Sequence, residues 1–332
     1  MINGLPWTGR RAANDDDVSA TTCVDVIIAA RDRADTIARA VSSALSQDAI
    51  RTVIVVDDGS TDDTAARASQ CDVSGNRVLV ERLHSSLGPA AARNVAIEIS
   101  KAPWLSVLDA DDFFLPGRIG ALLLQADDCD FVADHLVHVS ENSDPPISAP
   151  SPEGAKPIHL SFEEFVLGNV ARRGAPRKEL GYLKPLIRRQ FLDAHGLRYL
   201  ESLRLGEDYA LYARALAAGA RFRIIPTAGY VAVERRDSLS SRHTRRDLEV
   251  LRNSDRELMA MKQLTLPERD AVAKHYADVD RRAQWLVLVE ALQSHNYPRF
   301  LSTLFRSPAL TLYLTMRLIE ECPSQIHKFL NG

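Results

Sequence analysis

The fold is most constrained by an apolar run at residues 104–108 that ends in three carboxylates, those of Asp109, Asp111 and Asp112. A continuous apolar run of this length is typical of a strand that is buried in a parallel sheet. In open α/β sheets, ligands gather at the carboxyl ends of the strands. Acidic oxygens at that edge suit a hard divalent cation, Mg²⁺ or Mn²⁺, and the phosphates that such an ion holds.

The spacing of this acidic cluster has two interpretations. On an extended backbone, Asp109 and Asp111 point to the same side and Asp112 points elsewhere. The residues also suit the start of a helix, because Pro116 stands where a first helical turn would begin and acidic side chains complement the helix dipole. The cluster alone therefore leaves a ligand site and a helix cap as alternatives.

The rest of the first half alternates apolar strands with helical patterns. Strands are predicted at residues 24–30, 51–56, 77–83, 104–108 and 130–139. Helical patterns, such as the one at residues 116–126, fill the intervals, and the turns are short. This alternation predicts an α/β fold with a parallel sheet and right-handed crossovers.

The second predicted strand also ends in an acidic pair, Asp57 and Asp58. Gly59 permits a tight turn, and Ser60 or Thr61 with the acidic residues that follow fits a helix capping box. This cap does not account for the acidic pair itself. We therefore expect Asp57 or Asp58 to be free to accept a hydrogen bond from an N–H group of a ligand.

Four segments together resemble a known family, at residues 26–32, 55–62, 92–94 and 108–112. Their order and spacing are those of family 2 glycosyltransferases, which are inverting, metal-dependent GT-A enzymes. The longer similarity, over about residues 24–241, looks like that of bacterial exopolysaccharide glucosyltransferases of the succinoglycan type. The resemblance implies a Rossmann-like nucleotide-binding sheet, an acceptor-binding half and, beyond them, a helical C-terminal extension.

The resemblance also implies a reaction. A hexose, with glucose from UDP-glucose as the expected case, would be transferred to a growing lipid-linked exopolysaccharide oligosaccharide with a β linkage. Asp58 matches the aspartate that binds uracil, Asp111 matches the main metal ligand, and Asp109 lies beside it near the ribose and the metal. The implied cofactor is Mg²⁺ or Mn²⁺.

Three further positions are expected to contact the donor. Ala29 and Arg31 match residues that line the uridine, and Arg93 belongs to one of the four matching segments. The family usually has an aromatic residue where this chain has Arg31. A guanidinium group can also stack on a base, so UDP remains the expected nucleotide.

Asp208 is the candidate catalytic base. Gly206 interrupts the chain before a predicted helix, and Glu207 and Asp208 fall in its first turn, where they also complement the helix dipole. The pair resembles the Glu-Asp motif of the family, whose aspartate is the base. A sugar hydroxyl is a poor nucleophile, so a carboxylate must take its proton, while a metal held by Asp111 stabilises the departing UDP.

Residues 230–240 resemble a flexible loop of the family near the diphosphate. Arg235, Arg236 and His243 are expected to close over phosphates by charge-assisted hydrogen bonds. His243 is also a third candidate metal ligand, beside Asp109 and Asp111. A solvated basic loop is the alternative for these residues.

The chain is expected to divide into four regions: residues 1–22, a mobile tail; 23–140, a nucleotide-sugar-binding half; 141–243, an acceptor and catalytic-base half; and 244–332, a helical extension. Dense apolar runs in the extension predict packing against the enzyme domain or against a second copy. An interfacial helix that meets the membrane is the alternative.

Composition limits location and partners. No secretory leader, no run of 18 apolar residues and no C-x-x-C pair is present, which predicts a reduced cytoplasmic chain, peripheral to the membrane at most. The 41 basic and 44 acidic residues give a net charge of −3 and no global case for binding nucleic acid. A phosphatase of the haloacid dehalogenase type does not fit, because Phe113 stands where Thr or Val is required.

A component that binds nucleotide sugars with little catalysis is the remaining alternative to an enzyme. The retention of both Asp111 and Asp208 argues against it, because a sensor needs no base.

Overall fold

The computed structural model describes residues 23–73, 75–141, 154–171, 178, 180–234 and 243–329, with side chains to residue 320. The predicted tail at residues 1–22 lies outside these residues, as do Arg235 and Arg236. The chain forms two compact units whose segments alternate in sequence. Lys184–Asp193 and Ile224–Val233 join the chain up to Pro157 in the first unit; the second comprises Ile158–Leu183, Ala194–Arg223 and the chain from Glu234 onward.

The centre of the first unit is a parallel sheet with the strand order β3-β2-β1-β4. Its strands are β1 Val24–Ala30, β2 Ile50–Asp57, β3 Val78–Arg82 and β4 Trp104–Val107. β1 lies between β2 and β4, and Val24 is paired with both Ile50 and Trp104. The β-branched residues of β1 favour an extended backbone and are buried, as strands in the middle of a parallel sheet are. The predicted α/β centre is confirmed.

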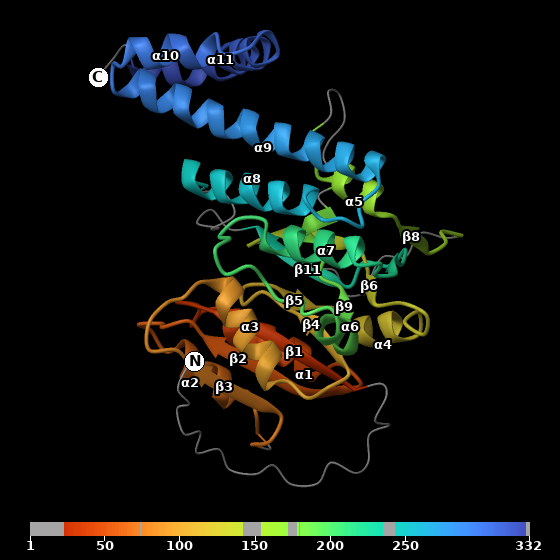
Figure 1. Ribbon diagram of the computed structural model, residues 1–332. Helices are drawn as coiled ribbons and strands as arrows, with labels where there is room; N and C mark the ends of the chain where they lie inside the picture. The colour runs from red at the N-terminus through yellow and green to blue at the C-terminus, as the bar shows by residue number, and fades with distance from the viewer. Residues whose placement is uncertain are drawn as a thin grey trace, which may run out of the picture. The chain divides into compact units, whose positions relative to one another are not determined.

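Helices pack on this sheet (Figure 1): α1 Ile37–Leu45, α2 Thr64–Gln70 and α3 Pro89–Ile99. Alternate residues of β1, such as Val26 and Ile28, share a buried cluster with Ile37 and Val41 of α1. Helix α3 packs on β1 and β2 and buries mainly alanines, which permits a close approach of the backbones. These contacts fix the turns at the carboxyl ends of the strands.

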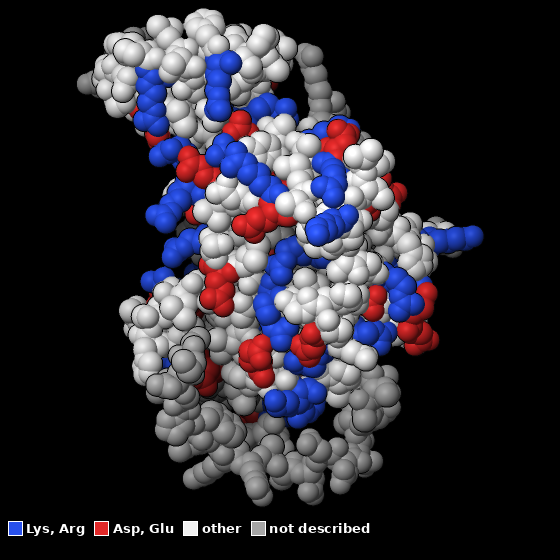
Figure 2. Space-filling model, in the orientation of Figure 1, with Lys and Arg blue, Asp and Glu red and all other residues white. Residues whose placement is uncertain are grey.

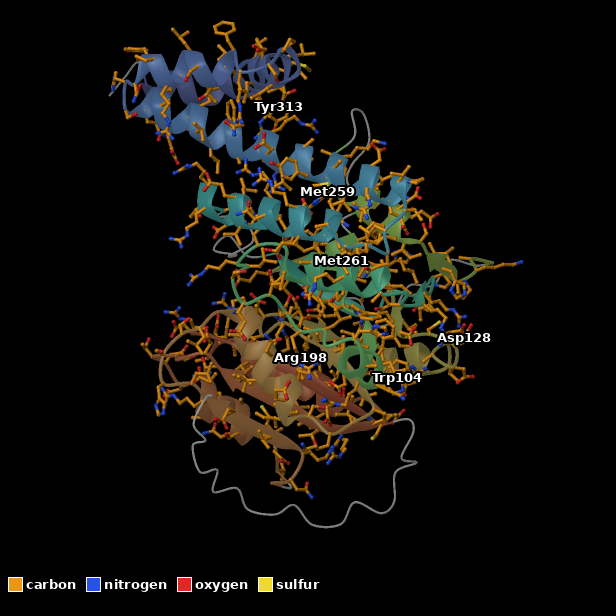
Figure 3. The ribbon with its side chains drawn as sticks, viewed as in Figure 1. Trp104, Asp128, Arg198, Met259, Met261 and Tyr313 are labelled. Atoms are coloured by element: carbon orange, nitrogen blue, oxygen red, sulfur yellow. The ribbon has the colours of Figure 1, made fainter. Side chains whose placement is uncertain are left out.

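The sheet is mixed rather than wholly parallel. β9 Leu186–Arg188 is antiparallel to β4, with Ile187 opposite Leu105, and β6 Phe131–Ala133 is antiparallel to β9. The Arg188 guanidinium lies 4.3 Å from the centre of the ring of Trp104, which is labelled in Figure 3. The prediction of a parallel sheet is thus wrong beyond β4, because a segment from later in the chain returns as β9 between β4 and β6.

The strand predicted at residues 130–139 is interrupted. It forms β6 and then β7 Leu136–Ser140, which belongs to a separate sheet of order β5-β11-β7 with β5 Phe113–Phe114 and β11 Tyr230–Glu234. The break falls where Asp134 accepts hydrogen bonds from Arg118 and where the His135 amide donates to the Thr227 carbonyl at 2.8 Å. Helix α4 Arg118–Leu123 is shorter than the predicted 116–126 and follows Gly117, whose φ is +77°.

The second unit is mainly helical. Its helices are α5 Phe162–Gly168, the 3-10 turn η1 Leu180–Tyr182, α7 Glu207–Ala217, α8 Arg245–Met259, α9 Leu266–Gln293, α10 Tyr297–Leu304 and α11 Pro308–Phe329, while the short α6 Arg189–Ala194 begins in the first unit. β8 Ile158–Leu160 and β10 Phe222–Ile224 are neighbouring strands. Phe165 of α5 stacks on Tyr209 and on Phe222, at 5.6 and 6.4 Å between ring centres. The predicted helical C-terminal region is confirmed.

Helices α8 and α9 begin with the same capping device. The hydroxyls of Thr244 and Thr265 accept a hydrogen bond from the backbone amide three residues later. In return, the carboxylates of Asp247 and Glu268 accept from the backbone amides of Thr244 and Thr265. Among the described residues, the helices are too short or too polar to cross a membrane.

Candidate active site

The acidic residues after β4 form a tight turn. The Asp112 amide donates to the Asp109 carbonyl at 3.1 Å, so the backbone is not extended here as the Asp-x-Asp interpretation required. Asp112 does point elsewhere, as expected: its carboxylate accepts from the Tyr230 hydroxyl and the Val233 amide, each at 2.8 Å. Burial and the nearby Asp109 and Asp111 carboxylates raise the pKa of Asp112 to about 7. Tyr230 also accepts from the Asp109 amide at 3.0 Å and so fixes the turn.

Asp109 lies between two cations. Arg93 of α3 donates to Asp109 Oδ1 at 2.7 Å, and Lys184 Nζ is 3.0 Å from Asp109 Oδ2. Burial raises the pKa of Asp109, but Lys184 and Arg93 outweigh it and hold this pKa well below its usual range. Asp109 is therefore a carboxylate throughout the physiological pH range. The structure brings the predicted residues Arg93 and Asp109 into direct contact.

Sequence reasoning missed Lys184. It precedes the apolar pair of β9, where a lysine that is only 6% exposed would not be expected unless it had a partner. The position of a lysine beside an apolar strand could have indicated a buried partner for it. The identity of that partner, Asp109, depends on the pairing of β9 with β4.

A buried ion pair supports Lys184 from behind. Arg118 donates to Asp134 through both Nε and Nη2, at 3.1 and 2.8 Å from Oδ1, and Nη2 also donates to the Lys184 carbonyl at 2.5 Å. The Gly229 amide donates to the other Asp134 oxygen at 2.6 Å, and a Cβ on Gly229 would lie 2.8 Å from Arg118 Cγ. Removing one partner of such a pair typically costs about 3–5 kcal/mol.

Asp58 holds a loop. Its oxygens accept from the Ser86 hydroxyl at 2.7 Å, the Leu87 amide at 2.6 Å and the Gly88 amide at 3.0 Å. Sequence reasoning did not foresee these three internal donors, which tie Asp58 to the loop before α3. A carboxylate has about four acceptor positions, so capacity remains for one more donor. Asp57 is also engaged, by the Ser60 amide at 2.9 Å and by Arg82 at 3.3 Å.

Arg31 lies beside Asp58 through a shared partner. Arg31 Nη1 donates to Ser86 Oγ at 2.8 Å, and the same hydroxyl donates to Asp58. More than half of the Arg31 side chain is exposed. Ala29, near the end of β1, is half-buried, and the Asp58 amide donates to the Ala30 carbonyl at 2.8 Å. Ala29, Arg31 and Asp58 thus lie together at the carboxyl ends of β1 and β2.

Asp111 is the carboxylate of this turn that is best placed for a metal ion. It is partly exposed, with Arg33 Nε 3.5 Å from Oδ2, and Arg39 donates to its backbone carbonyl at 2.8 Å. Among the described residues, no three His, Cys, Asp or Glu side chains converge as a complete metal cage. The carboxylates of Asp111 and Asp109 fit an ion such as Mg²⁺, which proteins often hold through one or two carboxylates together with phosphates of the substrate.

Asp208 lies in the second unit, in the first turn of α7. Gly206 precedes this turn with φ +74°, and a Cβ there would lie 2.9 Å from Leu251 Cδ1, so a larger residue would be strained and would displace Leu251. The Asp208 side chain is buried. Its position in the first turn agrees with the helix-dipole interpretation and leaves the role of base as a proposal. His243, the other predicted residue of this unit that the structure describes, is half-buried just before α8.

A buried polar cluster anchors α7 next to Asp208. The Tyr209 hydroxyl donates to Asp255 Oδ1 of α8 at 3.3 Å, and His275 Nδ1 of α9 lies 2.8 Å from Asp255 Oδ2. The Tyr209 and His275 rings stack with their centres 4.1 Å apart. These contacts hold the start of α7 against α8 and α9.

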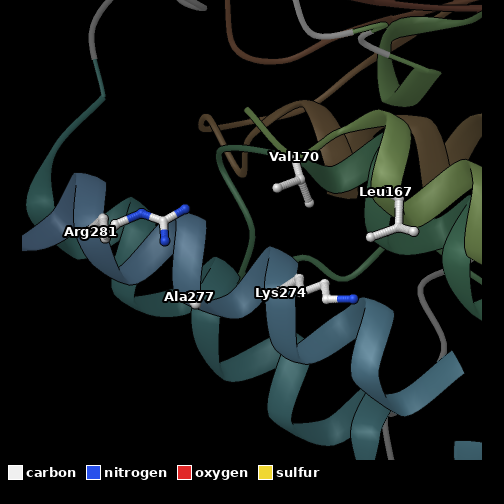
Figure 4. A pocket seen from close by; sticks show the side chains of 5 residues that line it. All are labelled: Leu167, Val170, Lys274, Ala277 and Arg281. Atoms are coloured by element: carbon white, nitrogen blue, oxygen red, sulfur yellow. The ribbon is translucent and has the colours of Figure 1, made fainter. Parts of the chain in front are cut away.

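The second unit also has a shallow hollow of about 350 Å³ between α5 and α9 (Figure 4). It is lined by Leu167, Val170, Lys274, Ala277 and Arg281. Its two cations are engaged, Lys274 with Asp270 at 2.6 Å and Arg281 with Asp278 at 3.2 Å. None of the predicted site residues lines this hollow, and we assign it no role.

Comparison with known proteins gives consistent matches. The family model for glycosyl transferase family 2 matches residues 25–175. The succinoglycan biosynthesis protein ExoU of Rhizobium meliloti (strain 1021) is 46% identical over 297 residues, which cover 88% of this chain and 85% of the relative. The succinoglycan biosynthesis protein ExoO of the same strain is 32% identical over 88% of this chain and 84% of its own length.

Solved structures agree in fold. S. aureus TarS 1-349 in complex with UDP-GlcNAc superposes with a TM-score of 0.61 over 86% of this chain and 91% of that chain, at 18% sequence identity. At this identity the likeness concerns the fold, a mixed central sheet with C-terminal helices.

Proposed function

The chain belongs to glycosyl transferase family 2 and is a glycosyltransferase, and from that premise we propose that it transfers a hexose from a UDP-sugar to an oligosaccharide of an exopolysaccharide. UDP-glucose is the proposed donor and a lipid-linked intermediate of a succinoglycan-type polymer is the proposed acceptor. The names of the two Rhizobium meliloti relatives support the polymer class, and the TarS complex with UDP-GlcNAc supports a UDP-sugar.

The observation that carries the donor proposal is the charge arrangement at one edge of the sheet. Asp58 and Asp109 follow β2 and β4, which flank β1, so both lie at the carboxyl ends of neighbouring parallel strands. Asp109 is kept ionised by Arg93 and Lys184. Asp58 accepts from the uracil N3–H, Arg31 stacks on or borders the base, and Ala29 leaves space for it.

Asp111, assisted by Asp109, would hold a Mg²⁺ or Mn²⁺ ion together with the donor diphosphate. When bound, this ion supplies Lewis-acid stabilisation of the charge on the departing UDP. Arg93 and Lys184 compensate the charge of Asp109, so the acidic turn can approach phosphates without strong repulsion. Arg235, Arg236 and His243 are proposed to add positive charge near the diphosphate, with His243 as the weakest candidate for a metal ligand.

Asp208 is the proposed base. As the acceptor oxygen bonds to the anomeric carbon, the bond from that carbon to the phosphate oxygen breaks, and UDP leaves with the electron pair. The proton of the acceptor hydroxyl passes to Asp208. Attack from the face opposite UDP converts an α-linked donor into a β-linked product. We place the reaction in the cytoplasm, with peripheral contact at the inner face of the membrane.

A donor panel tests this function. The purified chain is incubated with UDP-, GDP- and CDP-sugars and a succinoglycan-type acceptor, and nucleotide release is followed with Mg²⁺, with Mn²⁺ and with EDTA. We expect acceptor-dependent release of UDP from UDP-glucose that EDTA abolishes. Calorimetry with UDP on the same preparation separates an enzyme from a protein that binds nucleotide sugars with little catalysis. UDP binding without any transfer would favour the latter.

A further inference from the structure

Arg33 is a loosely held cation at the acidic turn, residues 109–112. Its Nε lies 3.5 Å from Asp111 Oδ2, whereas Arg93 and Lys184 approach the Asp109 carboxylate to 2.7 and 3.0 Å. The Arg33 side chain is also more exposed, at 19%, than those of Arg93 and Lys184, at 6% and 7%. Arg93 and Lys184 are therefore committed to Asp109, while Arg33 can exchange its partner with little rearrangement.

The turn that carries Arg33 is fixed from two sides. The Arg33 amide donates to Thr64 Oγ1 of α2 at 2.8 Å. The Thr36 hydroxyl donates to the carbonyl of Ala110, inside the acidic turn, at 2.9 Å. Asp32 has φ +48°, in the left-handed region that few residues other than glycine adopt, and so turns the chain at the end of β1. Arg33 is thus held at the carboxyl ends of β1, β2 and β4, the edge of the sheet where the donor is proposed to bind.

A divalent cation on Asp111 and the guanidinium of Arg33 would compete for one carboxylate. Because Arg33 already lies against Oδ2, an ion bound there would bring like charges close together. A diphosphate removes this conflict, since its oxygens accept charge-assisted hydrogen bonds from a guanidinium. Arg33 Nη1 donates to the Asp32 carbonyl at 3.1 Å, and the five N–H donors of an arginine leave others for phosphate oxygens.

This recognition is local. The face shown in Figure 2 carries acidic and basic side chains interspersed, and the net charge of the chain is −3. An anionic ligand therefore gains no attraction from the chain as a whole, and individual cations beside the acidic turn decide how well a diphosphate binds.

We propose that Arg33 is a donor-binding residue that pairs with Asp111 in the donor-free protein and contacts the diphosphate when the donor binds with its metal ion. Arg33 then has two effects of opposite sign: it weakens binding of the metal ion alone and strengthens binding of UDP together with the ion. Ion and nucleotide consequently bind cooperatively, each raising the affinity for the other. The proposal rests on the proposed function for the donor and the ion, and it adds a residue and a coupling between them.

A surface ion pair that supports the start of α1 is the alternative interpretation of the same contact. Pairs of this kind contribute little to stability. Loss of Arg33 would then lower the melting temperature slightly and would not shift the affinities for the metal ion and for UDP in opposite directions.

Binding measurements on the full chain test the proposal without any transfer reaction. Free Mn²⁺ is followed by electron paramagnetic resonance in the absence of nucleotide, and UDP and uridine are titrated by calorimetry with Mn²⁺ present. Arg33→Gln should bind Mn²⁺ alone roughly threefold more tightly, because a competing cation is removed. It should bind UDP in the presence of Mn²⁺ roughly tenfold more weakly, because charge-assisted contacts to the diphosphate are lost. Uridine, which has no phosphate, should bind as it does to the wild type.

Matched variants make the result specific. Arg67→Gln makes the same exchange at an exposed position of α2 in the same unit and should change neither affinity. Arg33→Lys keeps the charge, so it should bind Mn²⁺ alone as the wild type does and retain part of the UDP affinity. In an Asp111→Asn background, Arg33→Gln should no longer tighten Mn²⁺ binding, because the shared carboxylate is gone. Thermal melting checks that each variant is folded.

Three outcomes would overturn the role of Arg33. They are Mn²⁺ binding by Arg33→Gln that is no tighter than that of the wild type, UDP affinity that the variant leaves unchanged, and a loss of uridine affinity as large as the loss for UDP. Wild-type protein that binds UDP with Mn²⁺ but transfers no sugar would contradict only the proposed function. Wild-type protein that binds no UDP would overturn both.

Discussion

Lys184 Nζ lies 3.0 Å from Asp109 Oδ2, while Arg93 binds the other oxygen of the same carboxylate at 2.7 Å. Two cations thus converge on one aspartate of the acidic turn. Lys184 lies just before β9, Arg93 is in α3, and Asp109 follows β4. The acidic turn also contains the buried carboxylate of Asp112. The positive charges of Lys184 and Arg93 offset part of the repulsion among the three carboxylates of this turn.

The first prediction concerns Lys184. Lys184→Met keeps most of the volume and removes the charge, so folding should be largely retained while the pKa of Asp109 rises. Loss of such a supporting partner typically lowers metal affinity or activity by about 10- to 100-fold. Steady-state transfer rates and melting curves measure the two effects. Lys101→Met, at an exposed position of the same unit, serves as the control and should change neither.

Local patterns predicted much of this edge of the sheet. The strands before Asp58 and Asp109 were predicted because each is a contiguous apolar run, and parallel packing brings their ends together. Asp112 was expected to point away from Asp109 and Asp111 on an extended backbone, and in the turn that forms instead it binds Tyr230 and Val233. The extended geometry was wrong because the Asp112 amide closes a turn on Asp109.

What the sequence did not predict comes from distant segments. Lys184 and Tyr230 reach the acidic turn only because β9 pairs with β4 and β11 pairs with β5, and neither pairing leaves a local pattern. The engagement of Asp58 by residues 86–88 likewise depends on how the loop before α3 folds back. The predicted roles of Asp208 as base and of His243 as metal ligand stay predictions. They come from a sequence motif, and the contacts of these residues within their own unit do not test either role.

The second prediction concerns Asp111. Asp111→Asn should abolish metal-dependent strengthening of UDP binding and lower transfer by roughly 100-fold or more, because an amide is a poor ligand for a hard divalent cation. Stability should change little, since the side chain is partly exposed. Calorimetry with UDP, with and without Mn²⁺, measures the effect, and Asp48→Asn at an exposed site is the control. Wild-type activity that is unaffected by EDTA would contradict the metal assignment.

The third prediction separates two roles of Asp58. Asp58→Asn should reduce the preference for UDP over CDP, because an amide, unlike a carboxylate, can also donate a hydrogen bond to the N3 acceptor of cytosine. It should also destabilise the loop that Asp58 holds. Ser86→Ala is the matched variant: it removes one bond to the loop, at a cost of about 1 kcal/mol, but leaves the carboxylate. If both variants lose the UDP preference equally, Asp58 acts only through the loop.

The fourth prediction concerns pH and the start of α5. Hydrogen bonds from the Ser161 amide and hydroxyl lower the pKa of Glu164 below the usual value of a glutamate. A lowered folded-state pKa stabilises the protein above the unfolded-state pKa, and this contribution is lost as pH falls through the folded-state pKa. Glu164→Gln should therefore be less stable than the wild type at neutral pH, and the difference should shrink in acid. Chemical denaturation at several pH values measures it, and a difference that grows in acid would contradict the capping account.

The last prediction concerns Asp208 and its neighbour Glu207, which share the first turn of α7. If both only complement the helix dipole, Glu207→Gln and Asp208→Asn should each cost about 0.3–1 kcal/mol of stability and change transfer little. If Asp208 is the base, Asp208→Asn should bind UDP-glucose nearly as well as the wild type while transfer falls by roughly 10² to 10⁴. An amide keeps the shape and removes the proton acceptor, so the two interpretations differ in rate rather than in fold.

Glu207→Gln is thus the control that shares the helix, the turn and the charge of Asp208. Transfer to an acceptor, donor binding and thermal melting should be measured on the same preparations, and the wild-type product should be β-linked, since direct displacement inverts an α-linked donor. The Tyr209, Asp255 and His275 contacts anchor α7 in both variants, so a large shift of the helix is not expected to mimic loss of the base. Near wild-type transfer by Asp208→Asn together with loss of transfer by Glu207→Gln would move the role of base to Glu207.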